Sequence, residues 1–295
     1  MTKKKNKNKY KFIDLFAGIG GFHLAFHKIG AECVFASEWD KHARKTYELN
    51  HKKKSPKLFK NGYFNSDIND VKNIEEDIPD FNILTGGFPC QPFSNAGYKK
   101  GFEDTRGTLF FKIAEIIKIK QPEAYFIENV RGLLNHDNGR TFATIKNIIE
   151  NDLGYSFNSY LVKASDYGLP QMRPRIFMIG FKNNKLPFKA PKPVPLKKTM
   201  SDIWNGDCDR EIGLTLRCGG RGSNINDRRN WDSYRVNGKV RQLGPEEGKE
   251  MQGFPKSFKL PNSQTIAMKQ LGNSVAVPAI QVFAKEIIRT LEADV

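Results

Sequence analysis

Strand-like and helix-like segments alternate along the first 181 residues of this chain, and this alternation restricts the possible folds more than any other feature. Apolar runs rich in β-branched and aromatic residues indicate strands at 9–18, 32–39, 81–87, 123–130, 156–164 and 175–181. Segments with helical spacing of apolar residues lie at 21–30, 41–50, 108–120 and 140–154. Helices that connect parallel strands cover both faces of the sheet. We therefore predict an α/β domain with a mostly parallel sheet.

The alternation ends near Phe181, and the composition changes there. Residues 183–198 are rich in Pro and Lys, which is typical of an extended linker. The stretch 215–240 is rich in Gly, Arg and Asn, and its Asn237-Gly238 pair predicts a tight hairpin. An apolar helix is expected at 277–292. These changes predict three parts: a catalytic and ligand-binding domain at 1–185, a small irregular β-rich domain at 186–255, and a hinge with a returning C-terminal helix at 256–295.

The net charge of +16 indicates a polyanionic partner, and nucleic acid is the usual one for so basic a chain. Seven of the 14 arginines fall between Arg210 and Arg241, whereas the 34 lysines are spread along the chain. Arginine can bind a guanine edge through two hydrogen bonds, while lysine is a point charge suited to phosphates. We expect the 210–241 window to read bases, although its side chains could also contact phosphates alone.

The cysteines and the hydropathy predict a reducing cytoplasmic location. Cys33, Cys90, Cys208 and Cys218 form no C-x-x-C pair, so neither a disulfide framework nor a cysteine metal site is expected. No apolar run reaches membrane-spanning length, and the first residues lack the apolar segment of a signal peptide. His23 and His27 have i,i+4 spacing without the glutamate of a zinc protease motif. They are expected to be ordinary helix-surface histidines, so no metal is predicted.

The segment DLFAGIGGF, residues 14–22, places glycines between a predicted strand and a predicted helix. Such a turn lets a ligand approach the backbone closely. A dinucleotide fingerprint would need a third glycine where His23 stands, and no phosphate-binding P-loop is present. Glu38 ends the second strand, where an acid can bind ribose hydroxyls, Trp39 could stack on adenine, and Asp67 follows the next strand. Together these residues favour an adenosine ligand without pyrophosphate, such as S-adenosylmethionine.

The segment GGFPCQPFS, residues 86–94, holds one cysteine between two prolines after a strand. The prolines exclude helix and sheet, so Cys90 is presented from a loop and does not fill a core. A thiolate that adds to carbon 6 of cytosine makes carbon 5 nucleophilic enough to accept a methyl group. An acid at ring nitrogen 3 assists that addition. Glu128, near the end of the 123–130 strand, is suitably placed.

Taken in order, DLFAGIGGF, SEWD, GGFPCQPFS, ENV, QMRPRIF and QLGNSVAVP resemble the motifs of bacterial cytosine-5 DNA methyltransferases, and FEDTRGTLF (102–110) is similar to their mobile catalytic loop. The resemblance spans nearly the whole chain except 183–240. It implies the Rossmann-like fold of S-adenosylmethionine-dependent methyltransferases, with S-adenosylhomocysteine as product. It also implies these roles: catalytic Cys90, Glu128, Arg173 and Arg175; cofactor-binding Phe16, Gly18, Gly20, Gly21, Glu38, Trp39, Asp67, Ile68, Pro89, Leu109 and Asn273; DNA-binding Gln91, Ser94 and Arg106, joined by Arg217, Arg221, Arg228 and Arg235 of the arginine window.

The resemblance predicts an enzyme that flips a cytosine out of double-stranded DNA and methylates carbon 5. It further implies a cytoplasmic, nucleoid-associated monomer that serves a restriction–modification system, with a cognate endonuclease acting on the same site. Two alternatives remain open from the residues. A transfer-RNA cytosine methyltransferase could share most of these motifs, and a non-enzymatic DNA-binding regulator would explain the charge but not the placement of Cys90 and Glu128.

Overall fold

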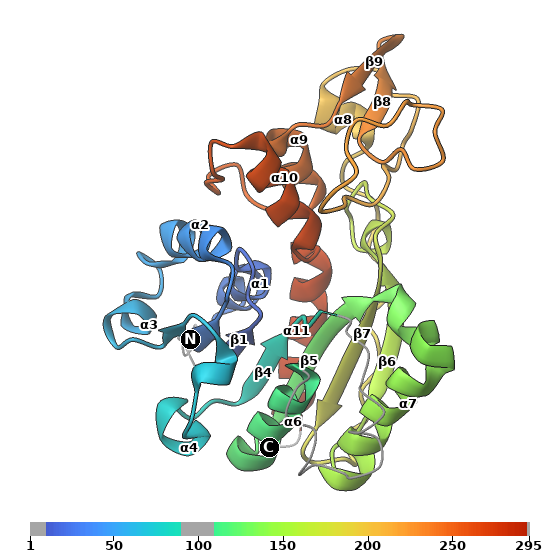
Figure 1. The fold of residues 1–295 in the computed structure, drawn as a ribbon. Coiled ribbons are helices and arrows are strands. Elements are labelled where there is room, and N and C mark those ends of the chain that lie inside the picture. Colours follow the sequence, from blue (N-terminus) through green and yellow to red (C-terminus); the bar gives the residue numbers. More distant parts are fainter. Residues whose placement is uncertain (1–9, 90–108, 294–295) are drawn as a thin grey trace, which may run out of the picture.

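The computed structural model describes residues 10–89 and 109–293 (Figure 1). Seven strands of these residues form one sheet: β1 (Lys11–Leu15), β2 (Glu32–Ser37), β3 (Phe64–Asn65), β4 (Ile83–Gly86), β5 (Ala124–Val130), β6 (Asn158–Lys163) and β7 (Pro174–Phe181). The α-helices are α1 (Gly21–Lys28), α2 (Lys41–His51), α3 (Pro56–Lys60), α4 (Ile74–Asp77), α6 (Leu109–Lys120), α7 (Arg140–Asn147), α8 (Met200–Trp204), α9 (Pro245–Met251), α10 (Gln264–Asn273) and α11 (Val277–Glu292).

The strand order is β3-β2-β1-β4-β5-β7-β6, and the sheet is mostly parallel as predicted. The strands from β3 to β5 pair in parallel, while β7 is antiparallel to both β5 and β6. The exception to the parallel arrangement is therefore β7. Residues 164–173 connect β6 to β7 with only a short 3-10 turn, η5 (Ala164–Asp166). A parallel pair needs a crossover of a dozen or more residues, so the shorter connection reverses the strand.

Hydrophobic side chains cover both faces of the sheet, as the alternating pattern predicts. Phe12 and Phe126 belong to one buried cluster, whereas their chain neighbours Ile13 and Ile127 belong to the other. This alternation follows from the two-residue period of a strand. Helices α1 and α11 pack on the first face, and α6 and α7 on the second (Figure 1). The site therefore rests on a core that is closed from both sides.

The C-terminal helix α11 returns to the sheet. The ring of Phe283 lies 5.0 Å from that of Phe177, 5.4 Å from Tyr167 and 6.1 Å from Phe126, centroid to centroid. Aromatic contacts of this kind bury large apolar areas. Because α10 precedes α11 directly, this packing also holds the 272–276 segment at the carboxyl edge of the sheet.

Between β7 and α9 the chain has little regular structure among the described residues. It contains a two-stranded antiparallel hairpin, β8 (Ser233–Val236) and β9 (Lys239–Gln242), which lies at the upper end of the molecule in Figure 1. Asn237 and Gly238 have φ of 48° and 76°, as a two-residue hairpin turn requires, which confirms the Asn-Gly prediction. The buried Trp231 and Tyr234 give this part a small apolar core. The boundaries at 185 and 255 stay a prediction.

Candidate active site

The glycine-rich turn follows β1 at the edge where the parallel strands end. Phe16, Gly18 and Gly20 all have left-handed backbones, with φ of 55°, 56° and 86°. A Cβ on Gly20 would lie 2.2 Å from Nε2 of His51, so only glycine fits there. In open α/β sheets ligands bind beside the carboxyl ends of the strands, and the β1/β4 neighbours flank the point where the strand order reverses. The predicted turn is thus formed where a ligand site is expected.

Glu38, directly after β2, is joined to this turn. Its Oε2 accepts a 2.7 Å hydrogen bond from the Gly18 N–H, and its Oε1 accepts a 2.8 Å bond from the Asp40 N–H. The residue is buried, and burial raises the pKa of its carboxyl against the lowering effect of the two N–H donors. The neighbouring Trp39 is 79% exposed. The structure therefore places a fixed carboxylate and an open indole face beside the turn.

A cavity of about 40 Å³ opens between the turn, β4, β5 and the α10–α11 junction. Five predicted site residues meet there, four predicted for the cofactor and one for catalysis: Phe16, Gly18, Gly21, Asn273 and Glu128. The prediction did not include the other lining residues, which are Ala17, Phe22, Gly87, Ser274 and Val275. Each of these is a neighbour in sequence of a predicted residue or motif, and that proximity is the signal that could have found them.

Seven other residues predicted for the cofactor do not line this cavity: Gly20, Glu38 and Trp39, described above, and Asp67, Ile68, Pro89 and Leu109. Ile68 is buried in the second hydrophobic cluster, and Asp67 accepts a 3.0 Å hydrogen bond from the Asn69 N–H at the start of the short helix η1 (Ile68–Asp70). Pro89 is exposed, and Leu109 is half-buried at the start of α6. Their role in binding stays a prediction.

Glu128, near the end of β5, forms an ion pair with Arg175 of β7. The distance between Arg175 Nε and Glu128 Oε1 is 2.9 Å, and the two side chains are 15% and 11% exposed. The pair forms because β5 and β7 are antiparallel neighbours in which Val130 faces Arg175. A buried carboxylate with a guanidinium partner is held in one orientation. The structure places these two predicted catalytic residues together, while their roles stay predictions.

The end of β5 is also tied to the segment that leads to the cysteine. Asn129 Nδ2 donates a 2.8 Å hydrogen bond to the Phe88 carbonyl, and a Cβ on Gly87 would lie 3.3 Å from Glu128 Oε2. Glu128 therefore stands directly over the strand-to-loop connection after β4. The remaining predicted residues of this region, Cys90, Gln91, Ser94 and Arg106, lie outside the described residues.

The side chain of Arg173 has different bonding partners from that of Arg175. Its guanidinium is buried and donates to the carbonyls of Leu216 at 3.1 Å and Gly272 at 2.9 Å, and also to that of Ser274. Burial and the neighbouring Arg175 lower the pKa of Arg173 to about 9, so it stays charged at neutral pH. The structure therefore directs this arginine to backbone carbonyls of two distant segments and not to the Glu128 carboxylate.

The expectation that His23 is a helix-surface histidine is wrong. His23 is fully buried, its Nδ1 lies 2.6 Å from the Tyr47 hydroxyl, and its ring stacks on His51 at 4.2 Å. Burial lowers the pKa of His23 well below its usual value and that of His51 to about 3, so both are neutral. The signal was the apolar sequence that surrounds His23 in the first six residues of α1, GFHLAF, all of which are buried. The His51 ring packs directly against Gly20 of the glycine turn, and His23 stacks on His51.

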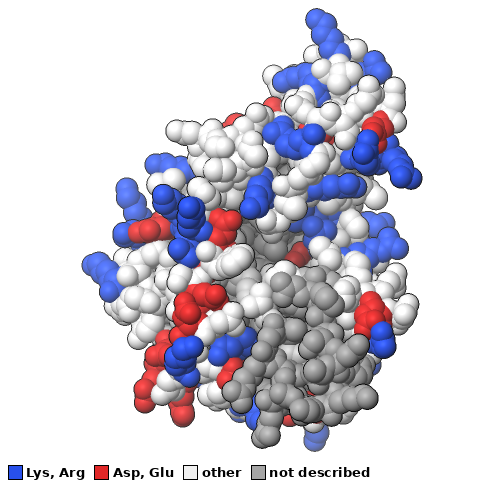
Figure 2. All heavy atoms as spheres, viewed as in Figure 1, with Lys and Arg blue, Asp and Glu red and all other residues white. Residues whose placement is uncertain are grey.

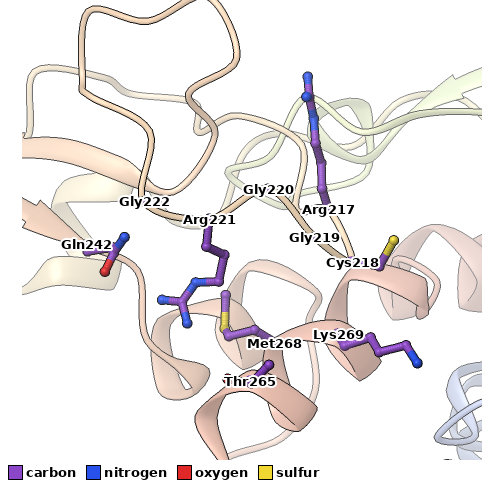
Figure 3. A pocket seen from close by; sticks show the side chains of 10 residues that line it. All are labelled: Arg217, Cys218, Gly219, Gly220, Arg221, Gly222, Gln242, Thr265, Met268 and Lys269. Carbon is purple, nitrogen blue, oxygen red and sulfur yellow. The ribbon is translucent and has the colours of Figure 1, made fainter.

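The arginine window divides into tethered and free side chains. Arg221 Nε lies 3.3 Å from Oδ2 of the fully buried Asp232, and Arg229 pairs with Asp227 at 2.7 Å. The other three arginines of the window that were predicted to bind DNA are Arg217, Arg228 and Arg235. They are exposed, and their side chains form no hydrogen bond or ion pair with the described residues. In Figure 3 Arg217 extends away from a cavity of about 340 Å³ between the 217–222 loop and α10.

Charged side chains are distributed unevenly over the viewed face (Figure 2). Figure 2 shows Lys and Arg side chains over the upper part of the viewed face, which carries β8 and β9, and acidic side chains mainly at the lower left, around α4.

No group of three or more potential metal ligands is found among the described residues. In the same part of the chain, the helices fall short of the length and apolarity that a membrane span requires.

Comparison with known proteins identifies relatives along almost the entire chain. The family model for C-5 cytosine-specific DNA methylases matches residues 10–215 and 215–289. The Type II methyltransferase M.SsoII of Shigella sonnei is 42% identical over 98% of this chain and 83% of its own length. M.HhaI of Haemophilus parahaemolyticus is 40% identical over 97% of this chain and 96% of its own.

Solved structures have the same fold. A DNMT2 variant of Spodoptera frugiperda superimposes with a TM-score of 0.69 at 21% identity, covering 96% of this chain and all of that one. The Dnmt2 methyltransferase of S. pombe gives a TM-score of 0.68 at 19% identity with the same coverage. At such low identity these similarities establish the arrangement of strands and helices alone.

Proposed function

This chain belongs to the C-5 cytosine-specific DNA methylases, and on that basis we propose how its own residues carry out the reaction. The enzyme methylates carbon 5 of cytosine in DNA. The observation that carries the mechanism is the position of Glu128, which lines the cavity beside the glycine turn and stands over Gly87, three residues before Cys90. A base held there would lie between a carboxyl group, the cysteine loop and the cofactor residues.

Carbon 5 of cytosine is a weak nucleophile, and the proposed catalytic residues make it more reactive. The Cys90 thiolate adds to carbon 6, while the Glu128 carboxyl holds ring nitrogen 3 and favours its protonation. Arg175 keeps Glu128 in position through their ion pair. Carbon 5 then accepts the methyl group that a bound cofactor would supply. A base, such as a water molecule, takes the carbon 5 proton, the Cys90 thiolate leaves carbon 6, and the aromatic ring is restored. Attack from above the ring requires that the base first leave the stack.

We propose that the cofactor is S-adenosylmethionine, which supplies an electrophilic methyl group and leaves as S-adenosylhomocysteine. The described residues fit such a molecule. The Glu38 carboxylate suits a ribose hydroxyl pair, Trp39 offers a ring face for adenine, and the left-handed turn at Gly18 leaves the backbone accessible. Sites for ligands of this size usually exceed roughly 300 Å³. Most of the cofactor would therefore lie beyond the small cavity, toward Glu38 and Trp39.

We further propose double-stranded DNA as the substrate, and the setting of a restriction–modification system in which a cognate endonuclease acts on the same site. The relatives at about 40% identity are Type II methyltransferases, which supports this setting. A cytoplasmic, nucleoid-associated monomer that needs no metal is the simplest form consistent with these proposals.

The substrate is tested with tritiated S-adenosylmethionine on duplex DNA and on transfer RNA of matched cytosine content. Label is expected in DNA alone, and bisulfite sequencing of that DNA gives the recognition site. Label confined to transfer RNA would favour the alternative RNA enzyme. A protein that binds DNA without transferring label would favour the regulator.

Glu38→Ala is expected to raise the S-adenosylhomocysteine dissociation constant roughly 10- to 100-fold, since a charge-assisted hydrogen bond contributes about 1.5–3 kcal/mol. Trp39→Ala should weaken binding through loss of stacking. Calorimetry measures both, with Glu48→Ala on the exposed surface of α2 as control. DNA affinity should change little. Unchanged cofactor affinity in both variants would remove these residues from the site.

Arg217→Ala is expected to relax specificity at one base position, because an arginine–guanine pair discriminates by roughly 1–3 kcal/mol. The same holds for Arg228 or Arg235 if either enters a groove. Arg221→Ala should instead lower stability and activity at all sites alike, since its side chain is bound to Asp232. Sequencing of methylated sites distinguishes these results, with Arg229→Ala as the tethered surface control. Uniform losses in all variants would place base reading outside this window.

A further inference from the structure

Two buried glutamines join four distant segments behind the active site. Gln171 donates a 2.9 Å hydrogen bond from Nε2 to the Met251 carbonyl and accepts a 3.0 Å bond from the Leu216 N–H at Oε1. Gln252 donates a 2.7 Å bond to the Leu271 carbonyl. Neither glutamine has any exposed surface. Buried side-chain networks of this kind hold their segments in one arrangement.

Arg173 completes this network, and the three residues Gln171, Arg173 and Gln252 are called the polar joint. Its guanidinium bonds the carbonyl of Leu216 on one side and those of Gly272 and Ser274 on the other. Its backbone φ of 21° is rare for a residue with a side chain, and its Nε is buried with no hydrogen-bond partner among the described residues. Such a costly conformation persists only where the surroundings impose it.

Backbone contact brings the same two segments together independently of Arg173. A Cβ on Gly272 would lie 2.3 Å from the Arg217 carbonyl carbon and 2.6 Å from the Cys218 nitrogen. The end of α10 therefore touches the loop that begins at Leu216 with nothing between them. Figure 3 shows the 217–222 loop running beside α10.

The residues that follow Gly272 in the chain form one wall of the cofactor cavity. Asn273, Ser274 and Val275 line that cavity. Val275 Cγ2 would be 2.5 Å from a Cβ on Gly21, so this wall also packs directly on the glycine turn. The polar joint thus connects the cavity wall to the start of the loop that carries Arg217. The connection consists of rigid groups: a planar guanidinium and close-packed backbone.

We propose that Arg173 is a positioning residue through which cofactor binding and DNA binding are coupled. This inference rests on the proposed function of the two sites. A cofactor bound against residues 273–275 would fix their position. Because the Arg173 guanidinium bonds both this segment and the Leu216 carbonyl, the start of the 217–222 loop becomes fixed as well, in the arrangement that binds DNA. By thermodynamic reciprocity, cognate DNA strengthens cofactor binding by the same factor.

The coupling is measured as the ratio of S-adenosylhomocysteine dissociation constants without and with a duplex that holds the site found by bisulfite sequencing. The wild-type ratio is expected to be at least about fivefold, within the usual range of coupling between sites. Arg173→Lys keeps the charge but loses the fork that bonds both segments, and its ratio should fall to within about twofold of one. A merely structural role would weaken both ligands and leave the ratio unchanged.

Gly272→Ala tests the same connection without altering Arg173. It provides the test if Arg173→Lys does not fold. The added methyl group separates α10 from the 217–218 backbone, and the ratio should again approach one. Gly132→Ala is the matched control, because its Cβ has only the Val130 side chain at 4.0 Å and the wild-type ratio should persist. Folded variants that keep the wild-type ratio overturn the inference. So does a wild-type enzyme that methylates the duplex with a ratio of one, and that result leaves the proposed function standing.

Discussion

Cys90→Ala is expected to abolish methyl transfer, with a loss on the order of 10⁶-fold, as for other enzymes that lose their covalent nucleophile. Without the thiolate, nothing adds to carbon 6, and carbon 5 stays too weak a nucleophile to accept the methyl group. The measurement is single-turnover transfer of labelled methyl groups to the cognate duplex. Cofactor affinity should be retained, since most residues that line the cofactor cavity, among them Phe16, Gly18 and Asn273, lie on other segments.

A duplex with 5-fluorocytosine at the target distinguishes covalent catalysis from simple positioning. Fluorine blocks the last proton removal, so wild-type enzyme and DNA should stay covalently joined in the presence of cofactor. Cys33, Cys208 and Cys218 serve as controls, and their alanine variants should still be trapped. Cys33 is buried and its thiol pKa is raised well above the usual value, so it is unreactive at neutral pH. Trapping of Cys90→Ser at the wild-type rate would disprove the assignment.

Glu128→Gln is expected to lower kcat roughly 100- to 10,000-fold, the usual contribution of general acid catalysis. The amide oxygen can still accept a hydrogen bond from Arg175, so the local structure should persist while the acid is lost. DNA affinity should therefore change little. Rapid-quench single-turnover kinetics measures the chemical step without interference from product release.

Glu123→Gln is the matched control, because Glu123 immediately precedes the same strand, is exposed and lies away from the cavity. Its single-turnover rate should equal that of the wild type. A wild-type rate in Glu128→Gln would refute the acid role and leave the carboxylate as a structural partner of Arg175.

Local sequence was sufficient for the features that depend on neighbouring residues. The alternation of apolar strand-like runs with helix-like segments indicated a sheet covered on both faces, and both faces are covered. The Asn237-Gly238 pair predicted its hairpin because few residues adopt φ above zero. The family resemblance implied that Glu128 and Arg175 belong to one site, and they form an ion pair.

Tertiary structure alone decided which distant groups meet. The reversal of β7 depends on how residues 164–173 cross the end of the sheet, and no periodicity within the strand records its direction. Arg173 and Arg175 are two residues apart in one motif, yet one bonds carbonyls of the 216 and 272–274 segments and the other bonds Glu128. Arg221 is tethered and Arg217 is free because only the folded loop places Asp232 beside the former. Sequence patterns encode backbone geometry and burial, which are local, whereas hydrogen-bond partners depend on contacts between segments that come together only in the folded chain.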